Sequence, residues 1–106
     1  TDSMAICAAH SIADFAEKRG ITADNIMPNM MENDLFPTVA ADVAMQAIKE
    51  GVALKALEWK EVYATAKKDI DESHAITQLL EDKGYISEFP QDKVLQIIQN
   101  VCNQVK

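Results

Sequence analysis

Two residues near the start of the chain could do chemistry together. Cys7 and His10 are three positions apart, so their side chains are neighbours if this stretch is a helix. A histidine beside a cysteine can generate a thiolate nucleophile. Cys7 lies among alanines, however, and no adjacent residue supplies an oxyanion hole or an acid that would orient the histidine. We therefore favour a cysteine at the edge of the core beside a surface histidine.

A zinc site is the second chemistry that these residues suggest. Together with His74 and Cys102, Cys7 and His10 make a set of four zinc-ligand types. Only the first pair has a recognised ligand spacing, and the other two residues lie on separate predicted helices. We expect His74 to be a solvated helix residue, and we expect no metal site in this chain.

The carboxylates and glycines do not point to a catalytic site. Most acidic residues lie opposite apolar stripes or near helix ends, where they are solvated and favour the helix dipole. The three glycines, Gly20, Gly51 and Gly84, are far apart, and each is typical of a helix end. The chain therefore contains no glycine-rich loop that could cradle a dinucleotide phosphate.

Composition limits the class of protein. The chain has 106 residues, a net charge of −7 and 48% apolar residues, which is enough for one small core. The acidic balance disfavours nucleic acid or an anionic membrane as a partner. No apolar run is long enough to span a membrane, and two cysteines make no disulfide scaffold, so we expect a cytoplasmic protein. The chain begins at Thr1 rather than Met, which suggests a processed product or a piece of a larger protein.

Two helices are predicted in the first half. Thr1, Asp2 and Ser3 are good N-cap types, and apolar residues recur at helical spacing up to Gly20, which predicts a helix over residues 3–19. A second helix is predicted over residues 35–50, with Asn33 or Asp34 as its cap. The buried face of the first helix is mostly alanine, so the partner of that helix should approach closely.

The second half predicts further helices and no strands. Five residues share one helix face: Trp59, Val62, Tyr63, Ala66 and Ile70. Asp71 is a good cap, so we expect a break there, with one long helix as the alternative. After Pro90 a last helix is expected, whose apolar side joins the core: Val94, Ile97, Ile98, Val101 and Val105. The prediction is an all-α chain of four or five helices.

The methionines add a possible binding surface. Met30 and Met31 lie in the polar segment between the first two predicted helices, where they must pack against something. Methionine is common at adaptable interfaces because its side chain is flexible and polarisable. Contact with another domain or subunit and contact within this chain are equally consistent with the sequence.

The first half resembles the C-terminal end of malic enzymes, especially the short bacterial and archaeal type. Residues 1–13, TDSMAICAAHSIA, look like the family's NDEMKIAAAEAIA. Residues 26–40, IMPNMMENDLFPTVA, align without gaps to IIPSPFDPRVVPAVA, and residues 51–53 match a GVA that follows the family's next helix. There are departures, since Met30 replaces a usual Pro, Met31 a Phe, Glu32 an Asp, Asp34 an Arg and His10 an acidic residue.

The resemblance implies oxidative decarboxylation of malate to pyruvate and carbon dioxide, with NAD or NADP and a Mg or Mn ion. It also implies that every catalytic, metal-binding and nucleotide-binding residue lies upstream, in a larger α/β enzyme that contains a Rossmann domain. The division expected is 1–53, malic-enzyme-like helices and loop, and 54–106, a helical extension of uncertain role.

The expected role of this chain is therefore structural, with the remainder of the parent enzyme as its partner and a homo-oligomer as its state, including a helix-swapped one. The expected interface residues are on the alanine face and the loop: Ala5, Ala8, Ala9, Ile12, Pro28, Met30, Met31 and Pro37. Two alternatives stay open. One is an independent helical interaction module whose resemblance is coincidental, and the other is an enzyme acting through Cys7 and His10.

Overall fold

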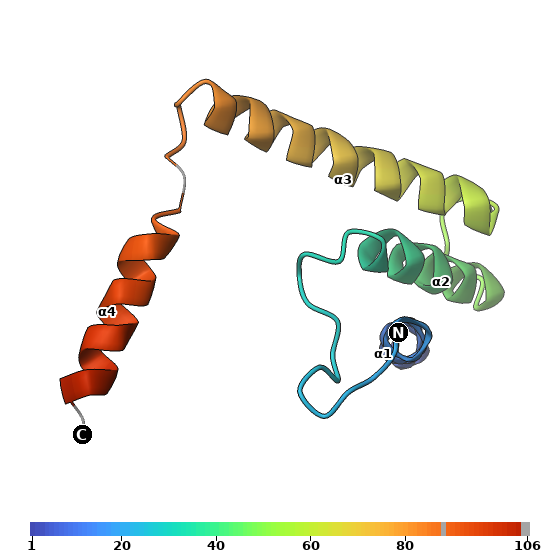
Figure 1. Ribbon diagram of the computed structural model, residues 1–106. Helices are drawn as coiled ribbons and strands as arrows, with labels where there is room; N and C mark the ends of the chain where they lie inside the picture. Colours follow the sequence, from blue (N-terminus) through green and yellow to red (C-terminus); the bar gives the residue numbers. More distant parts are fainter. Residues whose placement is uncertain (88, 105–106) are drawn as a thin grey trace. The chain divides into compact units, whose positions relative to one another are not determined.

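The computed structural model describes residues 1–87 and 89–104. In these ranges the chain forms four helices and no strand: α1 (Asp2–Arg19), α2 (Leu35–Lys49), α3 (Trp59–Asp82) and α4 (Gln91–Gln104), as Figure 1 shows. The all-α prediction is confirmed. Contacts divide the chain into two compact units, Thr1–Ser73 and His74–Lys106, and the boundary falls inside α3.

The ends of α1 follow its capping residues. The Thr1 hydroxyl accepts a hydrogen bond from the backbone N–H of Met4 at 3.3 Å, which satisfies one of the free donors of the first turn. At the other end Gly20 has a φ of 98°, a conformation that residues with a side chain rarely adopt. Lys18 and Arg19 lie in the last turn, where they complement the helix dipole.

The start of α2 has one of its two predicted caps, but without the capping hydrogen bond. Asp34 occupies the N-cap position, but its side chain makes no capping hydrogen bond. Its carboxylate instead lies 3.2 Å from the ammonium of Lys67 in α3. Pro37 lies in the first turn, where its missing N–H breaks no helical bond, and Gly51 follows the helix with a φ of 72°.

The core of the Thr1–Ser73 unit lies where α1 and α2 contact each other. In Figure 1 α1 is seen down its axis and α2 lies across the view, so the two helices cross. Its buried residues are mostly small: Ser11, Ala16, Leu35, Pro37 and Ala41. Ala41 is completely buried. Small side chains at the contact allow the two helix backbones to approach closely, as the alanine pattern predicts.

The predicted break at Asp71 is wrong, and the alternative of one long helix is confirmed. Asp69 and Asp71 are exposed, so their carboxylates stay in solvent without interrupting the backbone bonds. Asp71 also pairs with Lys67 one turn earlier, at 3.0 Å, which favours the helix. The predicted apolar face of the first half of α3 is half-buried at each of its five positions: Trp59, Val62, Tyr63, Ala66 and Ile70.

The prediction that the last helix belongs to the core is also wrong for the residues described. No residue of α4 is buried, and Val94 alone reaches intermediate exposure. Val105, the last position of the predicted stripe, lies outside the described residues. Among the described residues 74–104 none is buried, so nothing in this unit covers the apolar side of α4. None of the helices described combines the length and apolar character needed to cross a membrane.

Candidate functional site

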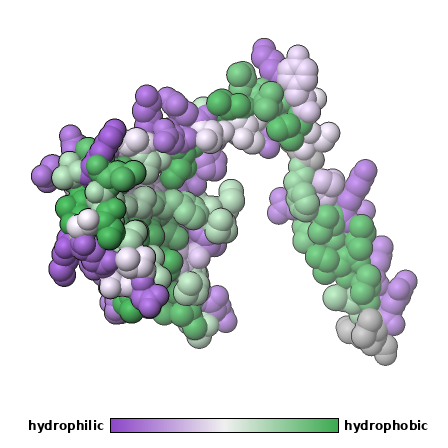
Figure 2. All heavy atoms as spheres, turned by 180° about the vertical axis from the view of Figure 1, so that it is seen from behind, coloured by the Kyte–Doolittle hydropathy of each residue, from purple (hydrophilic) through white to green (hydrophobic). Residues whose placement is uncertain are grey.

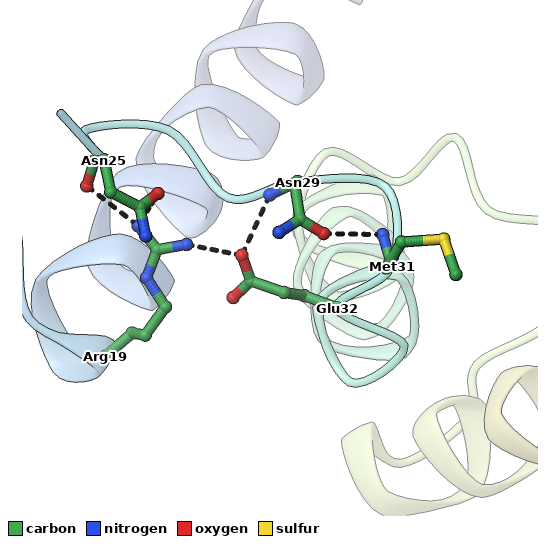
Figure 3. A network of polar contacts seen from close by, with 5 residues as sticks. All are labelled: Arg19, Asn25, Asn29, Met31 and Glu32. Atoms are coloured by element: carbon green, nitrogen blue, oxygen red, sulfur yellow. Dashed lines mark hydrogen bonds and ion pairs between the residues drawn. The ribbon is translucent and has the colours of Figure 1, made fainter. Parts of the chain in front are cut away.

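The segment between α1 and α2 is held by a polar clamp. The Arg19 guanidinium, at the end of α1, pairs with the Glu32 carboxylate, and Figure 3 shows this contact. The same guanidinium donates to the backbone oxygen and to the Oδ1 of Asn25, both at 3.0 Å. The side chains of Arg19 and Glu32 are 21% and 20% exposed, so the ion pair is shielded from much of the solvent.

The clamp continues from Glu32 into the backbone of the loop. Glu32 accepts a hydrogen bond from the backbone N–H of Asn29 at 2.9 Å, and the Asn29 side-chain oxygen accepts one from the N–H of Met31 at 2.8 Å (Figure 3). The backbone N–H of Leu35, at the start of α2, donates to the Glu32 carbonyl at 3.0 Å. Arg19 thus ties the loop to α1 at Asn25 and Glu32, and the local bonds around Glu32 shape the loop up to the start of α2.

This fixed loop exposes a group of large apolar side chains, which we call the Met surface: Ile26, Met27, Met30 and Met31. Met30 and Met31 are each 78% exposed. Exposed apolar groups on a positioned backbone are typical of a contact site, because the loop is already ordered before a partner binds. The four side chains of the Met surface carry no nucleophile and no titratable group.

A second polar cluster links the three helical elements of the Thr1–Ser73 unit. Asp42 in α2 accepts a hydrogen bond from the Ser11 hydroxyl of α1 at 2.5 Å, and one from the Trp59 indole N–H of α3 at 2.7 Å. The Trp59 ring stacks on Tyr63, with ring centres 5.0 Å apart. Both carboxylate oxygens of Asp42 are therefore used for structure.

Cys7 takes part in the same cluster. Its thiol donates to the backbone carbonyl of Asp42 at 3.6 Å. A shallow groove of about 370 Å³ runs along α1 and α2, and its lining includes Cys7, His10 and Asp42. In the part of the chain that the structure describes, no group of three or more His, Cys, Asp or Glu side chains is placed to hold a metal ion.

The predicted interface residues fall into three classes of exposure. Ala5, Ala9, Met30 and Met31 are exposed. Ala8, Ile12 and Pro28 are partly exposed. Pro37 is fully buried and belongs to the core of this chain, so the interface hypothesis depends on the other seven residues.

Two shifted pKa values mark exposed contacts between elements. The hydroxyl of Thr1, which donates to Glu50 at 2.6 Å, lowers the pKa of that carboxyl, and the Gln46 amide at 2.7 Å adds to the effect. Hydrogen bonds to Asp71 and then to Asp34 raise the pKa of Lys67. The bond between Thr1 and Glu50 links the start of α1 to the end of α2, and the pair of Lys67 with Asp34 links α3 to the start of α2.

Sequence patterns missed the residues that organise the site. Arg19 looked like an ordinary last-turn cation, and Glu32 and Asp42 looked like solvated carboxylates. Glu32 lies 13 residues from Arg19, and Ser11 and Trp59 lie 31 and 17 residues from Asp42, so the folded chain is needed to recognise these contacts. For Ile26 and Met27 the sequence does contain a signal, since an apolar pair before Pro28 in a polar loop indicates an exposed contact surface.

Comparisons with known proteins give a specific match. This chain is similar over all of its 106 residues to part of the crystal structure of Entamoeba histolytica malic enzyme, with 48% sequence identity and a TM-score of 0.86. Neither the protein-family models nor the curated proteins that were searched yield a match. The resemblance to malic enzymes is thus confirmed. It extends beyond residues 1–53 to the second half, which the sequence alone could not place.

The chain spans only 22% of the length of that malic enzyme. The described residues contain no ligand cluster for a divalent ion. Each glycine follows or ends a helix with a positive φ, and none forms a phosphate loop that leads into one.

Proposed function

We propose that this chain is the C-terminal segment of an NAD(P)-dependent malic enzyme. The whole enzyme would oxidise and decarboxylate malate to pyruvate and carbon dioxide, in the cytoplasm, with NAD or NADP and a Mg or Mn ion. The single observation that carries the proposal is the full-length similarity to Entamoeba histolytica malic enzyme at 48% identity. A shared alanine-rich composition would not produce 48% identity over the whole chain, so this match favours common ancestry over a coincidental resemblance.

The proposed role of the chain within such an enzyme is structural: it holds the loop between α1 and α2 in place and docks onto the remainder of the polypeptide. The Arg19–Glu32 clamp orders the loop, and the ordered loop presents the Met surface to the remainder of the polypeptide. Apolar contact of this kind is stabilised by removing side-chain surface from water. The catalytic groups would then be supplied by the part of the enzyme that precedes this chain.

An activity assay tests the proposal. We would measure malate-dependent reduction of NAD⁺ and of NADP⁺, with Mg²⁺ or Mn²⁺, for the 106-residue chain and for the polypeptide that joins it to its upstream sequence. The longer polypeptide should be active and the chain alone inactive. Activity of the chain alone would contradict the assignment of the catalytic groups. An inactive longer polypeptide would contradict malic enzyme and favour an independent helical interaction module.

A substitution in the Met surface tests the docking role separately. Met31→Asp places a charge on the Met surface and should weaken the stability of the longer polypeptide, while Leu54→Asp, at a fully exposed position outside that surface, should not. Thermal unfolding of the two variants, followed side by side, measures the difference. Equal effects would remove the Met surface from the proposal.

A further inference from the structure

The loop between α1 and α2 carries acidic side chains as well as the Met surface. It contains three carboxylates and no basic residue. Two of the three are paired within the chain, since Glu32 pairs with Arg19 and the Asp34 carboxylate lies 3.2 Å from the ammonium of Lys67. Asp24 is exposed, and among the described residues it has no ion-pair partner. The loop therefore carries one unpaired negative charge.

The backbone around Asp24 is held by the same clamp that orders the rest of the loop. Asp24 lies in a turn in which the backbone N–H of Asn25 donates to the Thr22 carbonyl at 3.1 Å. The Arg19 guanidinium binds the backbone and side-chain oxygens of Asn25, as Figure 3 shows. Ile26, the first residue of the Met surface, follows directly in sequence. The unpaired charge and the exposed apolar side chains thus belong to one ordered segment.

This combination restricts the chemistry of a surface that could cover the loop. In Figure 2 hydrophobic side chains lie beside hydrophilic ones over the visible face of the Thr1–Ser73 unit, so a partner meets both kinds. Apolar groups favour burial, but a carboxylate that loses its water without gaining a partner is costly. A lysine or arginine opposite Asp24 removes that cost, because it supplies a charge-assisted hydrogen bond to the carboxylate.

The observations favour the remainder of the polypeptide as the cover. The chain spans 22% of the length of the malic enzyme that it matches, so on the proposed function most of the polypeptide lies outside the structure. A second copy of the chain is disfavoured, because a symmetric contact would set the loop against its own copy. Two loops without a basic residue, in chains of net charge −7, repel each other.

We propose that the remainder of the polypeptide covers the Met surface with an apolar patch, and that a lysine or arginine of this patch pairs with Asp24. The inference rests on the proposed function, since its partner is the part of a malic enzyme that precedes this chain. It goes further, because it states the charge that this part carries at the contact. Asp24 thereby helps to select the surface that the Met surface binds.

Charge substitutions at Asp24, made both in the longer polypeptide and in the 106-residue chain, test the proposal. In the longer polypeptide Asp24→Lys brings two positive charges together and should lower the midpoint of thermal unfolding by about 3 °C or more. Asp24→Asn, which only removes the pair, should lower it by about 1 °C. In the 106-residue chain neither variant should lower the midpoint, because Asp24 has no ion pair there to lose.

A matched control and a salt series identify the cause of the effect. Asp69→Lys makes the same change at an exposed position of α3 outside the Met surface, and should leave the midpoint of the longer polypeptide within about 1 °C of wild type. Salt at about 1 M should remove most of the difference between Asp24→Lys and wild type, because it screens the repulsion.

Three results would overturn the proposal. If Asp24→Lys leaves the longer polypeptide unchanged while Met31→Asp destabilises it, the Met surface docks without a cation opposite Asp24. If Asp24→Lys destabilises the 106-residue chain equally, the charge acts within this chain. If that effect depends on the concentration of the 106-residue chain, the cover is a second copy. Failure of the proposed function gives a different result, namely a wild-type longer polypeptide without malate-dependent activity.

Discussion

The two units of this chain differ in how far they bury the apolar faces of their helices. Thr1–Ser73 buries residues from α1 and α2 and joins three helical elements through Asp42. The described part of His74–Lys106 is just as helical, yet it buries no residue. Helical periodicity is present in both, so amphipathic pattern alone does not tell whether a helix is covered by its own chain or by a partner.

The largest expected difference between the units is the effect of removing a leucine. Leu35→Ala should lower the free energy of unfolding of the first unit by about 3 kcal/mol, because Leu35 is buried and its loss leaves a cavity. Leu79→Ala, at an exposed position of the second unit, should change it by less than about 0.5 kcal/mol. Chemical denaturation followed by circular dichroism measures both, and equal effects would remove the distinction between the units.

A medium effect is expected from the polar link. Asp42→Ala leaves the Ser11 hydroxyl and the Trp59 indole without their acceptor and should lower the unfolding free energy by about 2 kcal/mol. Asp42→Asn should lose less than half of that, since the Ser11 hydroxyl can rotate to accept from the new amide.

The matched control for Asp42 lies in the second unit. Asp82 accepts a hydrogen bond from the Gln78 amide at 3.1 Å on the exposed surface of α3. Asp82→Ala should therefore change the unfolding free energy by less than about 0.5 kcal/mol. If Asp82→Ala destabilised the chain as much as Asp42→Ala, the Asp42 cluster would not be the link that we describe.

The smallest effect concerns pH. Hydrogen bonds from Thr1 and Gln46 lower the pKa of Glu50, so its contribution to stability is present above the ordinary value of 4.5 and is lost as the pH falls through the lowered pKa of the folded state. Wild type should be slightly more stable than Glu50→Gln at neutral pH, and the difference should vanish in acid. Urea midpoints measured across this range would show it, and a difference independent of pH would contradict the assignment to the carboxylate.

The sequence predicts α1 and α2 well because their ends are encoded locally. Thr1 and Gly20 delimit α1, and Gly51 follows α2, so neighbouring residues are sufficient. The break expected at Asp71 failed because its alternative, an exposed ion pair with Lys67, is equally local and keeps the helix continuous.

Long-range contacts account for the rest. The bonds of Asp42 to Ser11 and of Arg19 to Glu32 depend on how the helices pack, which no local pattern encodes. The predicted core position of Ile97 and Ile98 failed for a related reason, since an apolar stripe states that a cover is required and not which chain provides it. The interface roles of Met30, Met31 and the alanine face stay predictions.

Amide hydrogen exchange of the 106-residue chain as a function of its concentration tests most directly whether one unit is self-sufficient and the other requires a partner. Amides in the interiors of α1 and α2 should be protected at every concentration, because their core lies within one chain. Amides of α4 should exchange fast while the chain is monomeric, because no described residue of its unit is buried. Strong protection of α4 in a monomeric chain, or exchange in α2 as fast as in α4, would contradict the account.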